Sequence, residues 1–87
     1  MNKIVKTLRV LERGGDFKGN IAKKAHISQP NTNRVLDYME QQGLVDYRHM
    51  IRGMWVNITP TGRQALELYK KFTEFIGVTN NNIHIVE

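Results

Sequence analysis

Hydrogen-bonding side chains crowd one short stretch of the sequence, around residues 28 to 37. Four of them would stand on the outer side of a helix, namely Gln29, Asn31, Asn33 and Arg34. In the major groove of DNA, Asn and Gln can pair with adenine, and Arg can pair with guanine. Each good pair discriminates between bases by about 1–3 kcal/mol. These four residues are therefore the candidates for reading bases.

Cations flank this stretch on both sides. Lys23 and Lys24 precede it, and Arg48 and Arg52 follow it in a predicted hairpin. Such side chains neutralise backbone phosphates without reading the base sequence. Together with the hydroxyl of Ser28, these four cations are the predicted phosphate contacts.

Each group also has an ordinary structural explanation. Asn, Gln and Ser are favoured at exposed helix starts whether or not a ligand binds there. Arg34 could pair with Asp37, three residues along, for about 0.2–0.5 kcal/mol. Arg48 and Arg52 could simply keep a hairpin soluble. Binding is the favoured interpretation because amides and cations coincide on one predicted surface.

Catalytic chemistry has little support in the sequence. The histidines His26, His49 and His84 lack the spacing of metal ligands, and the chain has no cysteine. The sequence also lacks a Gly-rich phosphate loop and a nucleophile elbow. We therefore expect no catalytic residues, no metal and no cofactor, and a protein that is not an enzyme.

Length and charge limit the function further. The 87 residues allow one domain, and the net charge of +5 favours an acidic partner. Residues 1–34 hold eight basic and two acidic residues, whereas residues 35–87 hold five and six. The absence of an apolar run of about 20 residues argues against a membrane partner. We expect a cytoplasmic, nucleoid-associated protein.

The elements that position these residues can be read from the apolar spacing. A first amphipathic helix is predicted over residues 2–13, ended by Gly14-Gly15. Asp16 is expected to cap a short second helix that turns Ile21, Ala22 and Ala25 inward. A third helix over 29–42 begins at Ser28, with Pro30 in its first turn, and stops at Gly43. The short link at 25–28 predicts a steep helix-turn-helix crossing.

After Gly43 the spacing of the apolar residues changes from that of a helix to an alternation with a period of two, which is typical of β-strands. Residues 44–48 and 54–58 are predicted strands, joined by a tip at 49–53 that has Arg48 and Arg52 as its flanking cations. Trp55 alternates away from Val56 and Ile58, so it could cover the hairpin, pack in the core or meet a partner. Thr59-Pro60 then starts a last helix that runs to about residue 76.

In this order the residues resemble the winged helix-turn-helix of MarR-like and related small archaeal and bacterial transcriptional regulators. The resemblance lies in Ile21-Ala22, Ile27-Ser28, Arg34, Leu36, Met39, Gln42-Gly43-Leu44-Val45 and Ile58-Thr59-Pro60-Thr61-Gly62. It implies an α+β fold of three helices with a β-hairpin wing, extended here by a C-terminal helix. Two departures are His26, where the turn usually has Gly, and the small residues Ala25 and Thr32. A left-handed His26 is therefore expected.

The last helix carries a broad apolar arc that includes Ala65. The rest of the arc forms the predicted dimer contacts: Leu68, Tyr69, Phe72, Phe75 and Ile76. A helix of this length is longer than the small body beside it, so its far end needs another surface, most simply the same helix of a second subunit. Alternatively, the arc packs entirely on the first helix. The β-prone tail at 83–86 could add to the dimer surface.

We thus predict a homodimer that binds double-stranded DNA, with residues 1–59 as the DNA-binding part and 60–87 as the dimerisation element of one structural domain. The resemblance implies regulation of transcription. Two alternatives remain open. One is a sequence-neutral architectural DNA-binding protein, and the other is a winged-helix module that binds proteins through Trp55 and the C-terminal arc.

Overall fold

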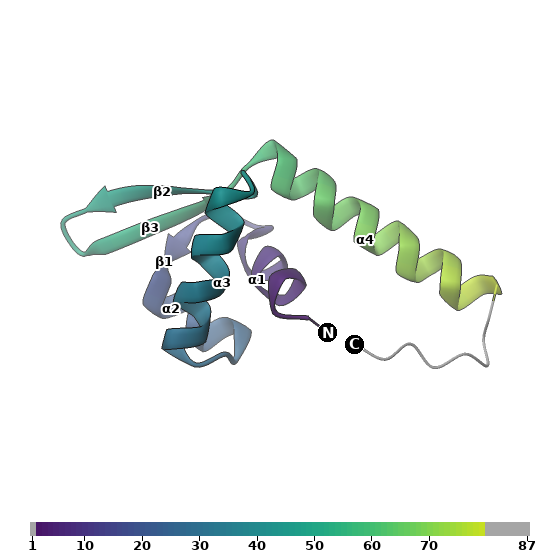
Figure 1. Cartoon of the computed structure of the whole chain (residues 1–87), viewed down its shortest axis with the longest axis horizontal. Helices are drawn as coiled ribbons and strands as arrows, with labels where there is room; N and C mark the ends of the chain where they lie inside the picture. Colours follow the sequence, from purple (N-terminus) through teal and green to yellow (C-terminus); the bar gives the residue numbers. More distant parts are fainter. Residues whose placement is uncertain (1, 80–87) are drawn as a thin grey trace.

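The structure, a computed structural model, describes residues 2–79, and the predicted tail strand and His84 lie outside this range. Figure 1 shows α1, α2 and α3 clustered beside a small sheet, while α4 leads away from them on the side opposite the hairpin. The elements follow in the order α1 (Lys3–Leu11), β1 (Asp16–Phe17), α2 (Lys18–Ala25), α3 (Gln29–Gln41), β2 (Val45–Met50), β3 (Gly53–Ile58) and α4 (Pro60–Thr79).

The start and end of α3 agree with the sequence prediction to within one residue. The Ser28 hydroxyl accepts a hydrogen bond from the Asn31 backbone N–H at 3.4 Å, and Pro30 lies in the first turn. After the helix, Gly43 adopts φ +73°, which lets the Leu44 N–H donate to the Met39 carbonyl at 2.8 Å. This left-handed glycine is a common way to end a helix, because it satisfies carbonyls of the last turn.

The turn between α2 and α3 depends on a left-handed histidine. His26 has φ 57° and ψ 45°, and its N–H donates to carbonyls at the end of α2. The expectation of a left-handed His26 is confirmed. Because the chain reverses within this short link, α2 and α3 pack steeply against each other, and the start of α3 is held at the surface.

The sheet contains one strand more than the sequence predicted. Within residues 2–79 the strand order is β1-β3-β2, and β1 pairs antiparallel with β3 through Asp16–Val56 and Phe17–Trp55. The prediction that Asp16 caps α2 is wrong, because Phe17 holds the cap position without a side-chain hydrogen bond. The Asp16 carboxylate instead accepts a hydrogen bond from the Phe17 N–H at 2.8 Å.

The hairpin is also longer than predicted. His49 pairs with Met54 and Met50 pairs with Gly53, so the tip is a two-residue turn at 51–52 rather than the five residues 49–53. Arg48, in β2, and Arg52, in the turn, keep their predicted positions along the hairpin. The wing therefore reaches further from the body, with Arg52 at its end.

The core lies where the helices meet β2 and β3. It is built from buried side chains of every element except β1: Val5, Leu8, Leu11, Ile21, Leu36, Met39, Val45, Val56 and Leu66. Thr7 and Thr32 are also fully buried. The Thr7 hydroxyl donates to the Lys3 carbonyl at 2.8 Å, whereas that of Thr32 has no partner within residues 2–79.

The start of α4 is fixed to this core. The Thr59 hydroxyl accepts a hydrogen bond from the Gly62 N–H at 3.0 Å, which confirms the predicted cap. A Cβ at Gly62 would overlap the Leu44 carbonyl, so the first turn of α4 lies directly against the start of the hairpin. Leu66, which the predicted apolar arc left out, is only 2% exposed.

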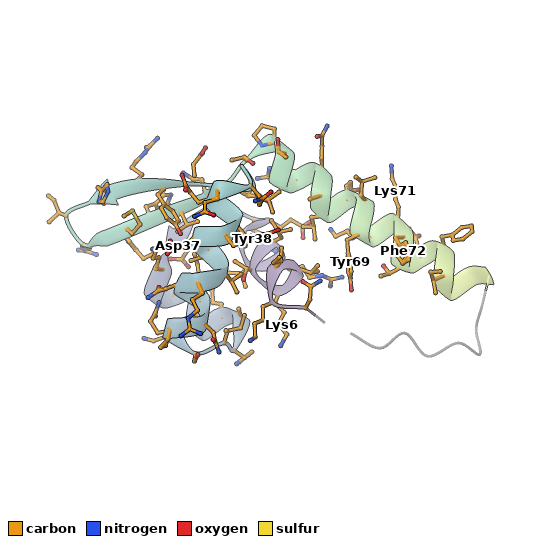
Figure 2. The ribbon with its side chains drawn as sticks, in the orientation of Figure 1. Lys6, Asp37, Tyr38, Tyr69, Lys71 and Phe72 are labelled. Carbon is orange, nitrogen blue, oxygen red and sulfur yellow. The ribbon has the colours of Figure 1, made fainter. Side chains whose placement is uncertain are left out.

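The apolar arc of α4 is divided between the core and the surface. Ala65 and Tyr69 pack against the core, whereas Leu68, Phe72 and Phe75 are exposed by 67%, 57% and 64%. The alternative in which the whole arc packs on the first helix is therefore wrong. In Figure 2, Tyr69 lies on the side of α4 that faces the body, and Lys71 lies on the other side. None of the helices within residues 2–79 is long and apolar enough to cross a membrane.

Candidate nucleic-acid interface

The outer face of α3 carries three of the four predicted base-reading residues. Gln29, Asn33 and Arg34 are exposed. Gln29 and Asn33, four residues apart, are neighbours on the helix surface, and Arg34 lies about 100° further round the helix from Asn33. The Gln29 side-chain amide donates to the Asn33 side-chain oxygen at 3.0 Å. This bond fixes the two amides relative to each other, and the Gln29 side-chain oxygen lies near Gly19 of α2.

The fourth predicted reader, Asn31, is placed differently. Its side chain is half-buried, and its position on the helical wheel puts it on the flank of α3 opposite Gln29 and Asn33. Its backbone N–H is already held by Ser28. The structure therefore pairs Gln29 with Asn33 through a hydrogen bond, and places the less exposed Asn31 on the far flank of α3, nearer to Arg34 than to that pair.

A carboxylate on the same helix is held by two other elements. The Tyr47 hydroxyl of β2 donates to Asp37 at 2.7 Å, and the Lys18 ammonium lies 3.8 Å from the same carboxylate. Lys18 also stands 4.4 Å above the centre of the Tyr47 ring. Burial, followed by the hydrogen bond to Asp37, raises the pKa of Tyr47, so its hydroxyl stays protonated and keeps donating. Figure 2 shows Asp37 on the hairpin side of α3.

This cluster links α2, α3 and the hairpin into one surface, and only Asp37 was noted from the sequence, as an outward residue. The structure also tests the alternative explanation for Arg34, an ion pair with Asp37. The partners of Asp37 are Tyr47 and Lys18, and the structure shows no Arg34–Asp37 ion pair among residues 2–79. The guanidinium of Arg34 is therefore exposed on the outer face of α3 and available to a ligand.

The hairpin presents its cations beyond this surface. Arg48 and Arg52 are exposed, and Ile51 between them is fully exposed at the tip. Trp55 pairs with Arg48 across the hairpin, and its ring meets Phe17 edge-on at 5.1 Å between centroids. Its indole N–H donates to the Asn57 side chain at 3.0 Å. Trp55 therefore supports the base of the hairpin together with β1, outside the buried core.

The two predicted phosphate contacts of α2 point to different sides. Gly19 lies near the Gln29 side chain, and Lys23, four residues later, shares that side of the helix. Lys24 turns the other way and forms an ion pair with Asp16 at 2.6 Å. Burial opposes ionisation of Asp16, but hydrogen bonds from Lys24, Asn20 and the Phe17 N–H outweigh it and lower its pKa. Only Lys23 therefore adjoins the α3 face.

Residues 2–79 contain no group of three or more His, Asp or Glu side chains that could hold a metal ion. The exposed side chains of the α3 face are donors, acceptors and cations, without a cleft around a reactive group. Such a surface suits a partner that offers base edges and phosphates rather than a small substrate.

Comparisons with known proteins agree with this geometry. A model of a family described as winged helix-turn-helix matches residues 2–77. A search of the curated proteins found no match.

Among solved structures, the transcriptional regulator BldR from Sulfolobus solfataricus is 21% identical, with a TM-score of 0.74, over 95% of this chain and 63% of its own. A MarR family transcriptional regulator from Silicibacter pomeroyi is 23% identical, with a TM-score of 0.72, over 92% of this chain and 55% of its own. MepR from S. aureus, in a complex with DNA, is 20% identical, with a TM-score of 0.77, over 93% of this chain and 70% of its own. These likenesses show the fold, and this chain spans less than two thirds of the length of the first two.

Proposed function

This chain belongs to the winged helix-turn-helix family, and from that premise we propose that it binds double-stranded DNA through the outer face of α3. The observation that carries the proposal is the exposed group of Gln29, Asn33 and Arg34 at the start of a well-capped helix. An α-helix fits the major groove of B-DNA, and its N-terminal residues then meet the base edges. The MepR structure, which has this fold, contains DNA.

In this proposal each part of the surface has a distinct role. Arg34 pairs with a guanine, and the oriented amides of Gln29 and Asn33 pair with an adenine beside it. Lys23, Ser28 and the wing arginines Arg48 and Arg52 contact phosphates and set the position of α3 in the groove. Of the other predicted contacts, Asn31 lies on the flank of α3, and Lys24 faces away from this surface toward Asp16.

We further propose that the protein acts as a homodimer through the exposed row on α4. Leu68, Phe72 and Phe75 are separated by four and three residues, so they form one continuous apolar strip. Contiguous exposed apolar surface on a soluble chain commonly marks an interface. Pairing two such strips about a two-fold axis buries both, with Tyr69 and Ile76 at the edge next to the body.

A two-fold dimer would present two copies of α3 to half-sites about 34 Å apart, one turn of the duplex. The solved structures of similar fold include proteins described as transcriptional regulators. Reading a two-fold site on DNA is a means of regulating transcription, and we propose that role here, in the cytoplasm and at the nucleoid. Residues 1–59 would supply the DNA-binding part, and residues 60–87 the dimerisation element.

A salt titration of DNA binding tests the first proposal. With a fluorescent duplex, the logarithm of the binding constant should fall linearly with the logarithm of salt concentration, by about 0.9 per phosphate neutralised. The protein is measured as the full 87-residue chain. A chain that shows no affinity for any duplex at low salt would contradict the proposal.

Sedimentation of the wild type and of Phe72→Glu tests the dimer. We expect a dimeric wild type and a monomeric variant, because a carboxylate in the middle of the strip would be buried without a partner. Gln42→Glu, at an exposed position after α3, adds the same charge away from the strip and should stay dimeric. A monomeric wild type, or a dimeric Phe72→Glu, would refute the interface.

A further inference from the structure

Much of the positive charge of residues 1–34 lies away from the α3 face. Lys6 and Arg9, three residues apart, share one side of α1, and Arg13 lies in the turn that follows the helix. The other side of this helix is buried in the core, where α3 also packs, through Val5, Leu8 and Leu11. The three cations therefore face away from the packed interior, on the side of α1 that α3 does not cover.

These cations line a groove between α1 and α2. A hollow of about 630 Å³ is bordered by Arg9, Arg13 and Lys24, and a neighbouring one of about 320 Å³ by Lys6, Arg9 and Lys24. Because Arg9 and Lys24 border both, the two hollows lie next to each other. We call this surface the α1 groove and define it by Lys6, Arg9, Arg13 and Lys24. Figure 2 shows Lys6 extending from α1 away from α4 and the hairpin.

The carboxylates near the α1 groove are already engaged. Glu12 is paired with Lys70 of α4, and the hydrogen bond from that lysine lowers the pKa of Glu12. Asp16 is paired with Lys24. No carboxylate of residues 2–79 lies within ion-pair distance of Lys6, Arg9 or Arg13. Glu12 itself borders the first hollow and its charge acts on Arg9, so the positive charge of the groove is partly neutralised, and an excess of cations over carboxylates remains.

The length of the row indicates the kind of anion that fits it. From Lys6 to the end of α1 at Leu11 the helix rises about 7.5 Å, and Arg13 lies beyond it in the turn, so this row of cations is longer than a single phosphate or carboxylate. Phosphates along one strand of DNA advance about 3.4 Å each, so the row spans about three of them. The apolar lining is limited to Val10 and Ala25, which offer no aromatic anchor of the kind that protein interfaces favour. The row therefore suits an extended phosphate backbone better than an acidic protein segment.

We propose that the α1 groove binds the phosphate backbone of a second DNA duplex while α3 holds the first. This inference rests on the proposed function only for the first duplex. DNA stays nearly straight over about 150 base pairs, so one short duplex seated on α3 does not also reach the outer side of α1. Each subunit would then have two DNA-binding surfaces, and the protein would bridge duplexes.

A capture experiment with two short duplexes tests the bridging. One duplex is fixed to beads, and a second, fluorescent duplex is added with the full-length protein. The variant Arg9→Gln/Arg13→Gln removes two cations of the groove, and Lys71→Glu, on the exposed side of α4, is the control with the same change of net charge. All three proteins are also titrated with a single duplex at limiting protein, and their helix content is compared by circular dichroism.

We expect the wild type and Lys71→Glu to capture the fluorescent duplex, and the double variant to capture at least about tenfold less, while its affinity for a single duplex changes less than about twofold. The salt dependence of capture should weaken by about 1.8 in log-log slope, for two phosphates lost. A wild type that binds one duplex but captures no second, or a double variant that captures normally, would overturn the inference and leave the α3 proposal standing. A wild type that binds no duplex would overturn both.

Discussion

The α3 face and the α1 groove are both basic, but different side chains surround their cations. On the α3 face, Arg34 stands beside two oriented amides and near a carboxylate, Asp37, that Tyr47 and Lys18 hold in place. In the α1 groove, Arg9 and Arg13 lie near Lys24 and Glu12, and none of the residues that border that hollow has an amide side chain. Fixed donors and acceptors can distinguish bases, whereas charge alone attracts any phosphate backbone. The difference predicts selective binding at one surface and unselective binding at the other.

The largest expected effect comes from Arg34→Ala. It should weaken binding to a preferred site by about 1–3 kcal/mol and relax the choice of base, because a bidentate guanine contact is lost. The measurement is fluorescence anisotropy with the preferred duplex and a scrambled one. Arg13→Ala is the matched control in the α1 groove and should not alter base choice. Equal losses on both duplexes for Arg34→Ala would contradict the distinction between the surfaces.

Tyr47→Phe should have a smaller effect that is confined to the α3 face. Removal of the hydroxyl takes away the hydrogen bond to Asp37, and we expect the free energy of unfolding to fall by about 1 kcal/mol. Urea unfolding at neutral pH measures this loss. Since the freed carboxylate would lie near Arg34, selectivity between the two duplexes should also fall. Unchanged stability and selectivity would show that the cluster does not support the reading surface.

Lys23→Ala and Lys24→Ala should affect DNA binding differently, because the two lysines lie on different sides of α2. Lys23 adjoins the α3 face, so its loss should weaken binding to every single duplex alike and reduce the salt slope by about 0.9. Lys24 is paired with Asp16 beside the α1 groove, so its loss should leave this slope unchanged. Salt titrations of both variants measure the difference. Identical slopes would mean that the two lysines serve one surface.

The smallest effect concerns pH. Because its hydrogen bonds lower the pKa of Asp16 in the folded protein, its contribution to stability is present above the pKa of the unfolded chain, about 3.9, and is lost as the pH falls through the lowered folded value. Asp16→Asn should therefore cost stability, by less than about 1 kcal/mol, at pH 7 and nearly none at pH 2. Urea unfolding at both values checks this, with Asp46→Asn, an exposed carboxylate of the hairpin, as the control. An equal cost at both values would contradict the assignment.

The local signals in the sequence were sufficient for most of the helix boundaries. Ser28, Pro30 and Gly43 act through their own backbone neighbours, so the limits of α3 could be predicted to within one residue. The left-handed His26 was expected from the family resemblance, because the turn usually has Gly at this position. The strand β1 was missed because two residues show no periodicity, and Asp16 resembled a helix cap as much as a strand residue.

The division of charge and apolar surface could not be predicted in this way. Leu66 enters the core and Leu68 does not because the contact of Gly62 with Leu44 fixes the rotation of α4. Lys23 and Lys24 point about 100° apart on α2 in any case, but the pairing of Lys24 with Asp16 depends on the strand β1, which was not predicted. Both outcomes depend on contacts between different elements. The predicted site residues of α2, α3 and the wing remain predictions until DNA binding is measured.

Selection of bound sequences from a random pool of duplexes tests the central claim most directly, because it asks whether α3 reads bases. The wild type should enrich a two-fold site whose half-sites lie about one turn apart and contain guanine beside adenine, and Arg34→Ala should lose the preference for guanine. A pool that is bound but not enriched would contradict base reading, and a pool that is not bound at all would contradict DNA binding altogether.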